Sequence, residues 1–253
     1  MSEHIKVERD DGVLAITLAR PDRRNAITVA MYETLAAALL SAADDPPIRL
    51  ITLRGDGADF TAGNDLMDFL AEVRPDSIDD LPVGRFLAAL ANNSVPLVAA
   101  VHGNAIGIGT TMLLHCDLVL AEEGTRFKMP FVELGLVPEA ASSLILPALA
   151  GRRAAARMLL LGESFGAAEA LAWGIASHVV PTGGAERALA ETVATLLSRP
   201  PEALRLTQGL LRAGNKAAVL ERILLESGHF GERLQSDEIK QAIAAFFAAR
   251  AER

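Results

Sequence analysis

The sequence has little of what several classes of protein require. It contains one cysteine, Cys116, among 253 residues, which excludes an intramolecular disulfide framework and fits a reducing compartment. No apolar run reaches the length that a membrane-spanning helix needs. The start of the chain is charged and lacks the apolar segment of a secretory signal. We therefore expect a cytoplasmic protein without a membrane partner.

Positive charge is also scarce, because the formal net charge is −8. This balance argues against a nucleic-acid surface or an anionic membrane as the main partner, although a small anionic ligand depends only on local charge. No cluster of His, Cys and carboxylate residues has metal-ligand spacing, so no metal site is predicted. The chain is, in contrast, 51% hydrophobic. That content supports the sizeable core of one large domain, or of a main domain with a smaller appendage.

Strands and helices alternate in the first two thirds of the chain, and helices fill the last third. Residues 5–9 and 13–18, separated by Asp-Asp-Gly, predict a β-hairpin. A strand, a glycine-bearing turn and a helix follow one another at 48–70 and again at 97–116. This recurrence indicates an α/β architecture with helices packed on a sheet.

The change to purely helical sequence suggests that the chain has two parts. We place the boundary near residue 195, which gives a core domain over 1–195 and a helical C-terminal region over 196–253. Within the core domain, Thr28 is placed to cap the helix that follows it.

Two glycine-bearing turns, at residues 62–65 (AGND) and 105–109 (AIGIG), each end a buried strand and open a helix. Glycine allows backbone to approach a ligand closely, and a helix N-terminus offers N–H groups without intrahelical partners. Two such N–H groups that converge on one point would stabilise an oxyanion. The residues alone fit this interpretation and that of ordinary tight turns equally well.

Three short motifs suggest other functions. The GIG at 107–109 resembles part of a dinucleotide fingerprint, but Met112 replaces its third glycine, which disfavours a nicotinamide site. The GESFG at 162–166 matches a nucleophile elbow, yet it follows a helical segment instead of a strand. We therefore expect Ser164 to cap the next helix. Arg23-Arg24 fits either a solvated loop or a phosphate contact.

Glu139 is a carboxylate in an otherwise apolar segment. It follows Pro138 directly and precedes an apolar helix. A charged side chain buried without a partner costs several kcal/mol, so Glu139 is either at the surface or functional. A carboxyl group in apolar surroundings has a raised pKa and can act as a base near neutral pH.

Four segments together resemble the crotonase, or enoyl-CoA hydratase/isomerase, superfamily. They are RPDRRNAI at 20–27, GADFTAGNDL at 57–66, PLVAAVHGNAIGIG at 96–109 and FKMPFVELGLVPEAASS at 127–143. The resemblance covers essentially the whole chain. It implies an α/β fold, a crotonase-like spiral of ββα units with a C-terminal helical trimerisation region, assembled as a homotrimer or a hexamer. It also implies an acyl-CoA thioester substrate, with CoA as part of the substrate and no separate cofactor.

The resemblance also assigns residues by position. It implies an oxyanion hole made by the backbone N–H groups of Asn64 and Ile108, with Glu139 as the catalytic carboxylate. The residues that it places along CoA are Arg24, Asn25, Ala26, Ile27, Ala62, Asp65, Leu66, Lys240 and Phe246. For the acyl tail, helix faces suggest Met67, Phe69, Leu70, Phe86 and Leu87, beside a polar loop at 72–83.

One departure from the family pattern indicates the reaction. Family hydratases hold water between two glutamates, and their positions here are occupied by Thr111 and Phe131. With Glu139 as the carboxylate, the sequence resembles the Δ3,Δ2-enoyl-CoA isomerase branch, in which one base moves a proton from C2 to C4. Two alternatives stay open. One is another crotonase reaction, hydratase-like or on a ring-containing or hydroxylated acyl-CoA, and the other is non-catalytic binding of acyl-CoA.

Overall fold

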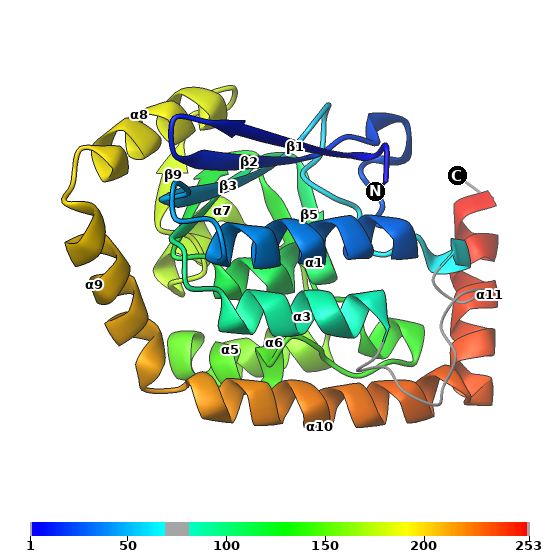
Figure 1. Ribbon diagram of the computed structural model, residues 1–253. Coiled ribbons are helices and arrows are strands. Elements are labelled where there is room, and N and C mark those ends of the chain that lie inside the picture. The colour runs from blue at the N-terminus through cyan, green and yellow to red at the C-terminus, as the bar shows by residue number, and fades with distance from the viewer. Residues whose placement is uncertain (1, 69–80, 252–253) are drawn as a thin grey trace.

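The computed structural model describes residues 2–68 and 81–251, without the side chains of residue 244 and residues 246–251. Its centre is a six-stranded sheet with the strand order β1-β2-β3-β4-β6-β9 (Figure 1). The strands are β1 (Ile5–Asp10), β2 (Val13–Leu18), β3 (Leu50–Gly55), β4 (Leu97–Val101), β6 (Leu118–Glu122) and β9 (His178–Val180). β1 and β2 form the predicted antiparallel hairpin, and every other neighbouring pair is parallel.

A second sheet of three short strands, β5 (Asn104–Ile106), β7 (Arg126–Lys128) and β8 (Phe165–Gly166), has the order β5-β7-β8. β5 directly follows β4, and β7 follows β6. After β3, Thr61 joins the same sheet through a parallel bridge to Ala105. A long strand, a short strand and a helical segment therefore recur, as the expected spiral of ββα units requires.

Two local predictions in this sheet need correction. The sequence predicted a helix from β4 onward, but β5 intervenes, since its backbone pairs with β7. Ser164 does not cap the next helix, because Phe165 pairs with Phe127 in the sheet and Gly166 becomes the N-cap.

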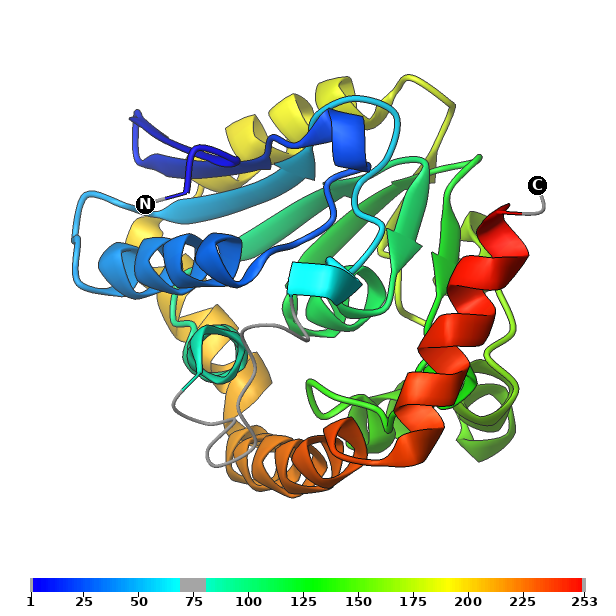
Figure 2. The same cartoon turned by 90° about the vertical axis from the view of Figure 1, so that its right-hand side faces the viewer.

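The helices cover the sheets and extend around the molecule (Figures 1 and 2). They are α1 (Val29–Ala43), α3 (Pro82–Asn92), α4 (Ile108–Thr111), α5 (Ser142–Ala150), α6 (Arg152–Leu160), α7 (Ala167–Ala172), α8 (Ala185–Leu197), α9 (Pro201–Ala213), α10 (Lys216–Leu234) and α11 (Asp237–Ala251), with 3-10 turns η1 (Pro21–Arg23), η3 (Met112–His115) and η4 (Val132–Leu134). None of the helices in the described ranges is long and apolar enough to cross a lipid bilayer. The predicted domain boundary at residue 195 lies inside α8.

α1 begins as predicted, because the Thr28 hydroxyl accepts a hydrogen bond from the Met31 amide at 3.3 Å. In Figure 2, α11 is the red helix that runs up one side of the molecule from the end of α10. α9, α10 and α11 thus form the helical last third that the sequence indicated.

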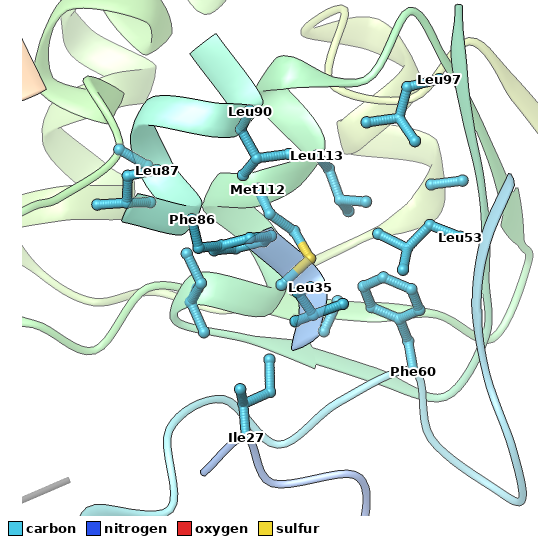
Figure 3. Close-up of a cluster of buried hydrophobic side chains, with 14 of the residues drawn as sticks. Ile27, Leu35, Leu53, Phe60, Phe86, Leu87, Leu90, Leu97, Met112 and Leu113 are labelled. Atoms are coloured by element: carbon cyan, nitrogen blue, oxygen red, sulfur yellow. The ribbon is translucent and has the colours of Figure 1, made fainter. Parts of the chain in front are cut away.

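A cluster of buried side chains joins α1 and α3 to the sheet (Figure 3). Leu35 of α1, Leu53 of β3 and Phe86 of α3 are each at most 4% exposed. Burial of one such side chain contributes about 1.5–3 kcal/mol. Phe86 and Leu87 therefore belong to the core, and they are not among the residues that line the cavity described below. The apolar face of a helix packs against a sheet wherever the fold places a sheet beside it.

Candidate active site

A cavity of about 610 Å³ lies between the two glycine turns, the segment after β7 and the C-terminal helices. Its walls include residues 62–67 and 106–108, which are the turns singled out in the sequence. Opposite elements contribute Phe131, Leu136 and Phe230. The volume falls in the range of about 300–1,000 Å³ that is usual for small-molecule sites.

The first turn is held by hydrogen bonds from the amides on both sides of Asn64. The amide of Gly63 donates to the Thr61 hydroxyl at 3.0 Å, and the amide of Asp65 donates to the Ile27 carbonyl at 2.9 Å. Within the described residues, the Asn64 amide between them donates to no protein acceptor. Gly63 has a φ of 88°, a conformation that glycine adopts readily. The turn thus leaves one N–H group available at the wall of the cavity.

The second turn is arranged in the same way around Ile108. The amide of Gly107 donates to the Lys128 carbonyl at 2.8 Å, and the amide of Thr111 donates back to the Gly107 carbonyl at 3.1 Å. Ile108 is the first residue of α4, where an amide has no intrahelical acceptor. Asn64 and Ile108 both line the cavity. Two amides of this kind can stabilise an oxyanion on a bound carbonyl compound.

Glu139 contacts the last residue of α4 through a hydrogen bond. One of its carboxylate oxygens accepts a hydrogen bond from the Thr111 hydroxyl. Burial, opposed by the hydrogen bond from Thr111 and reinforced by the negative charge of Glu226, raises the pKa of Glu139 to about 8. Glu139 is partly buried and is not itself among the residues that line the cavity. α4 therefore joins a cavity amide at its first residue to a carboxyl group of raised pKa at its last.

Tyr32 completes this polar cluster, and the sequence analysis missed it. Its side chain is fully buried on α1, and its hydroxyl donates to the side-chain oxygen of Asn64. Burial, followed by the charge of Glu139, raises the pKa of Tyr32 well above its ordinary value. The only tyrosine of the chain lies on a helix that faces the core, where its hydroxyl needs a partner. That signal could have identified it.

The chain is also similar in sequence to known proteins. A family model described as enoyl-CoA hydratase/isomerase matches residues 8–252. The chain belongs to the enoyl-CoA hydratase/isomerase family.

Individual members of the family carry different names. Rat enoyl-CoA delta isomerase 2 is 32% identical over 249 residues, which are 97% of this chain and 63% of that protein. The 2,3-dehydroadipyl-CoA hydratase of Escherichia coli K12 is 32% identical over 250 residues, 99% of this chain and 97% of that protein. The structure of Pseudomonas aeruginosa OdaA superposes with a TM-score of 0.90 and 43% identity, covering 97% of this chain and 99% of that one. Similarity thus assigns the family and leaves the reaction open.

The family residues expected along CoA divide into two groups. Ala26, Ala62, Asp65 and Leu66 line the cavity. Asp65 also accepts a hydrogen bond from Arg20 at 2.8 Å. Although burial opposes ionisation, the hydrogen bonds from Arg20 and from the backbone of Asp68 keep the pKa of Asp65 below its ordinary value. Met67, expected along the acyl tail, lines the cavity too.

The other expected residues whose side chains the structure describes do not line the cavity. Ile27 is buried, and the side-chain amide of Asn25 donates to the Asp59 carbonyl inside the protein. The side chains of Arg24 and Lys240 are 68% and 70% exposed. Phe246 lies in α11, but its side chain is outside the described part of the structure, as are Phe69, Leu70 and residues 72–80.

Two basic residues that the CoA assignment did not include also line the cavity. They are Arg23, the neighbour of Arg24, and Lys128, which lies 2.8 Å from Glu133. Arg23 belongs to the pair for which a phosphate contact was one interpretation. Among the described residues, no group of three or more His, Cys, Asp and Glu side chains could hold a metal ion.

Proposed function

We propose that the protein is an acyl-CoA isomerase that shifts the double bond of a 3-enoyl-CoA to the trans-2 position. The observation that carries this proposal is the carboxyl group of Glu139, whose pKa is raised, near a cavity with two available amides. Thr111 and Phe131 occupy the positions at which the family resemblance places the two hydratase glutamates. Neither side chain can activate water as an acid or base.

The chemistry requires one base. Glu139 removes a proton from C2, and the electrons of that C–H bond move into the thioester to give a dienolate. Its negative charge rests on the thioester oxygen, between the amides of Asn64 and Ile108. One such donor is worth about 3 kcal/mol in the transition state. The protonated Glu139 then returns the proton at C4, and the double bond forms between C2 and C3.

The cavity supplies surroundings that suit an acyl-CoA. Phe131, Leu134 and Leu136 offer apolar walls for an acyl chain, and Arg23 and Lys128 offer positive charge for phosphates. A carboxylate with a pKa of about 8 also matches the requirement that a general base titrates near the working pH.

We propose further that copies of the chain associate as a homotrimer or a dimer of trimers. Large apolar side chains on α9 face solvent in the single chain, with Leu210 and Leu211 at 77% and 76% exposed. Exposed apolar patches commonly mark association surfaces. Sedimentation of the purified protein measures this directly, and a monomer at micromolar concentration would contradict it.

The test of the reaction is Glu139→Gln assayed with a 3-enoyl-CoA. Loss of the base should lower kcat by about 10²–10⁴-fold, with a smaller change in KM. It should also abolish exchange of the C2 proton in deuterated water. Glu221→Gln, an exposed carboxylate on α10, is the matched control and should behave like the parent.

Three outcomes would overturn the isomerase assignment. Undiminished turnover by Glu139→Gln would remove Glu139 from the mechanism. Formation of 3-hydroxyacyl-CoA from crotonyl-CoA as the main activity would indicate a hydratase. Binding of acyl-CoA by the parent without any C2 exchange would indicate a non-catalytic role.

A further inference from the structure

The backbone that follows Glu139 has an unfavourable conformation. Ala140 and Ala141 have φ values of 58° and 56°, in the left-handed region that residues with a side chain rarely adopt. Such a conformation persists only where the surrounding structure holds it. The direction of the Glu139 side chain therefore depends on the contacts of this two-residue bend.

A buried carboxylate from a distant helix makes those contacts. Glu226 of α10 is 5% exposed and accepts hydrogen bonds from the Ala141 amide at 2.6 Å and from the Ser143 amide at 3.0 Å. One helical turn earlier, Arg222 donates to the Ser143 hydroxyl at 3.0 Å. A carboxylate this deeply buried is costly unless its hydrogen bonds are made, and both of its oxygens are used on this one bend.

A third element holds the bend from the other side. The ring nitrogen Nε2 of His115 lies 2.8 Å from the Ala140 carbonyl oxygen. Burial lowers the pKa of His115 to about 4, so the ring is neutral at physiological pH and donates its N–H to that carbonyl. The bend is thus fixed at the Ala140 carbonyl by His115 and at the amides of Ala141 and the nearby Ser143 by Glu226.

We infer that Glu226 is a positioning residue for the catalytic base, holding the Ala140–Ala141 bend so that Glu139 is presented to Thr111 and the cavity. This inference rests on the proposed role of Glu139. It makes α10, in the helical C-terminal region, part of the active-site machinery, although Glu226 itself touches no substrate.

The charge of Glu226 also affects the pKa of the catalytic base. Its negative charge raises the pKa of Glu139 beyond the effect of burial. The other groups that face the pair are Arg222 on α10, Thr111 on α4, Tyr32 on α1 and the neutral ring of His115. Removal of the Glu226 charge should therefore lower the pKa of the base, whereas a variant that keeps the charge and the burial should leave that pKa unchanged.

The test is Glu226→Gln, which keeps the shape of the side chain and removes its charge. Its amide oxygen can still accept one of the two N–H groups. We expect kcat for a 3-enoyl-CoA to fall by about tenfold to a hundredfold, with KM within about twofold, because a misdirected base affects the chemical step. The acid limb of the kcat–pH profile, which reports the base in the enzyme–substrate complex, should move to lower pH.

Two further variants keep this test decisive. Glu226→Asp retains the charge on a shorter side chain and should retain the parental pH limb even where kcat falls. Glu221→Gln, on the exposed face of the same helix, should leave both kcat and the pH limb unchanged. If Glu226→Gln unfolds, which circular dichroism would show, the pH limb of Glu226→Asp decides. A limb displaced to lower pH in that charged variant would contradict the electrostatic role.

The two proposals fail in different ways. Full turnover by Glu139→Gln would overturn the proposed function itself. An inactive Glu139→Gln together with a folded Glu226→Gln that has parental kcat and pH profile would overturn only the positioning role of Glu226.

Discussion

The two polar sides of the candidate site are built in different ways. One side offers the amides of Asn64 and Ile108, which belong to turns of the ββα spiral and are flanked by backbone hydrogen bonds to neighbouring segments. The other side offers Glu139, whose bend pairs with no strand among the described residues and is held by the side chains of Glu226 and His115. Backbone donors are thus a product of the fold itself. The base depends on side chains that other elements must supply.

The two sides should therefore respond differently to pH. The amides are neutral, so their contribution to catalysis should not vary with pH. The carboxyl group has a pKa of about 8, and a general base must be ionised to act. Activity should therefore rise as the pH increases through about 8, with the position of this rise set only by groups around Glu139. Variants on the two sides should then differ in whether they move the pH profile.

The largest effect on the amide side is expected for Gly63→Ala. Gly63 has a φ of 88°, and a Cβ there would lie 2.7 Å from the Ile106 carbonyl oxygen. The turn must shift, and the Asn64 amide shifts with it. Loss of one oxyanion donor lowers kcat by about 10²–10³-fold, and the strain should also lower the melting temperature.

The pH limb of Gly63→Ala should stay where the parent has it. Gly228→Ala is the matched control, since a Cβ at that position on α10 meets no atom within 4 Å. Steady-state kinetics across pH, combined with thermal melting, checks both variants. A displaced pH limb in Gly63→Ala would show that the two sides are not independent.

The sequence predicted the amide side better than the carboxylate side, for a physical reason. The conformation of a glycine turn is determined within a few residues, so AGND and AIGIG marked the two turns, in which the family resemblance assigned Asn64 and Ile108. Glu139 could be recognised from its apolar segment. Glu226 could not, because nothing in the pattern of α10 indicates which amides, 83 and 85 residues away in sequence, its carboxylate meets.

Other differences between the predicted residues and the lining of the cavity have the same origin. Phe86 and Leu87 lie on an apolar helix face, and periodicity cannot distinguish a face that packs in the core from one that lines a cavity. Arg23 and Arg24 are adjacent in sequence, and Arg24 has a left-handed backbone with a φ of 52°. Only Arg23 lines the cavity.

A smaller effect, confined to the carboxylate side, is expected for Thr111→Val. The hydroxyl of Thr111 donates to Glu139 and lowers its pKa, so its removal should move the acid limb of the kcat profile above pH 8. A displacement of about one pH unit corresponds to about tenfold lower turnover at pH 7, with near-parental turnover on the alkaline side. Thr111→Ser retains the hydroxyl and should restore the limb. A uniform loss at every pH would contradict this account.

The smallest effect is expected for Tyr32→Phe, which tests whether the two sides are coupled. The hydroxyl of Tyr32 bonds the side chain of Asn64, whereas the Asn64 amide is fixed by the backbone bonds of Gly63 and Asp65. Loss of one neutral hydrogen bond should therefore lower kcat by only about threefold to tenfold. Tyr32 is uncharged in the working pH range, since its pKa is raised, so the pH limb should not move. A displacement as large as that of Thr111→Val would mean that Tyr32 contributes to the environment of Glu139 and that α1 tunes the base as well as supporting the turn.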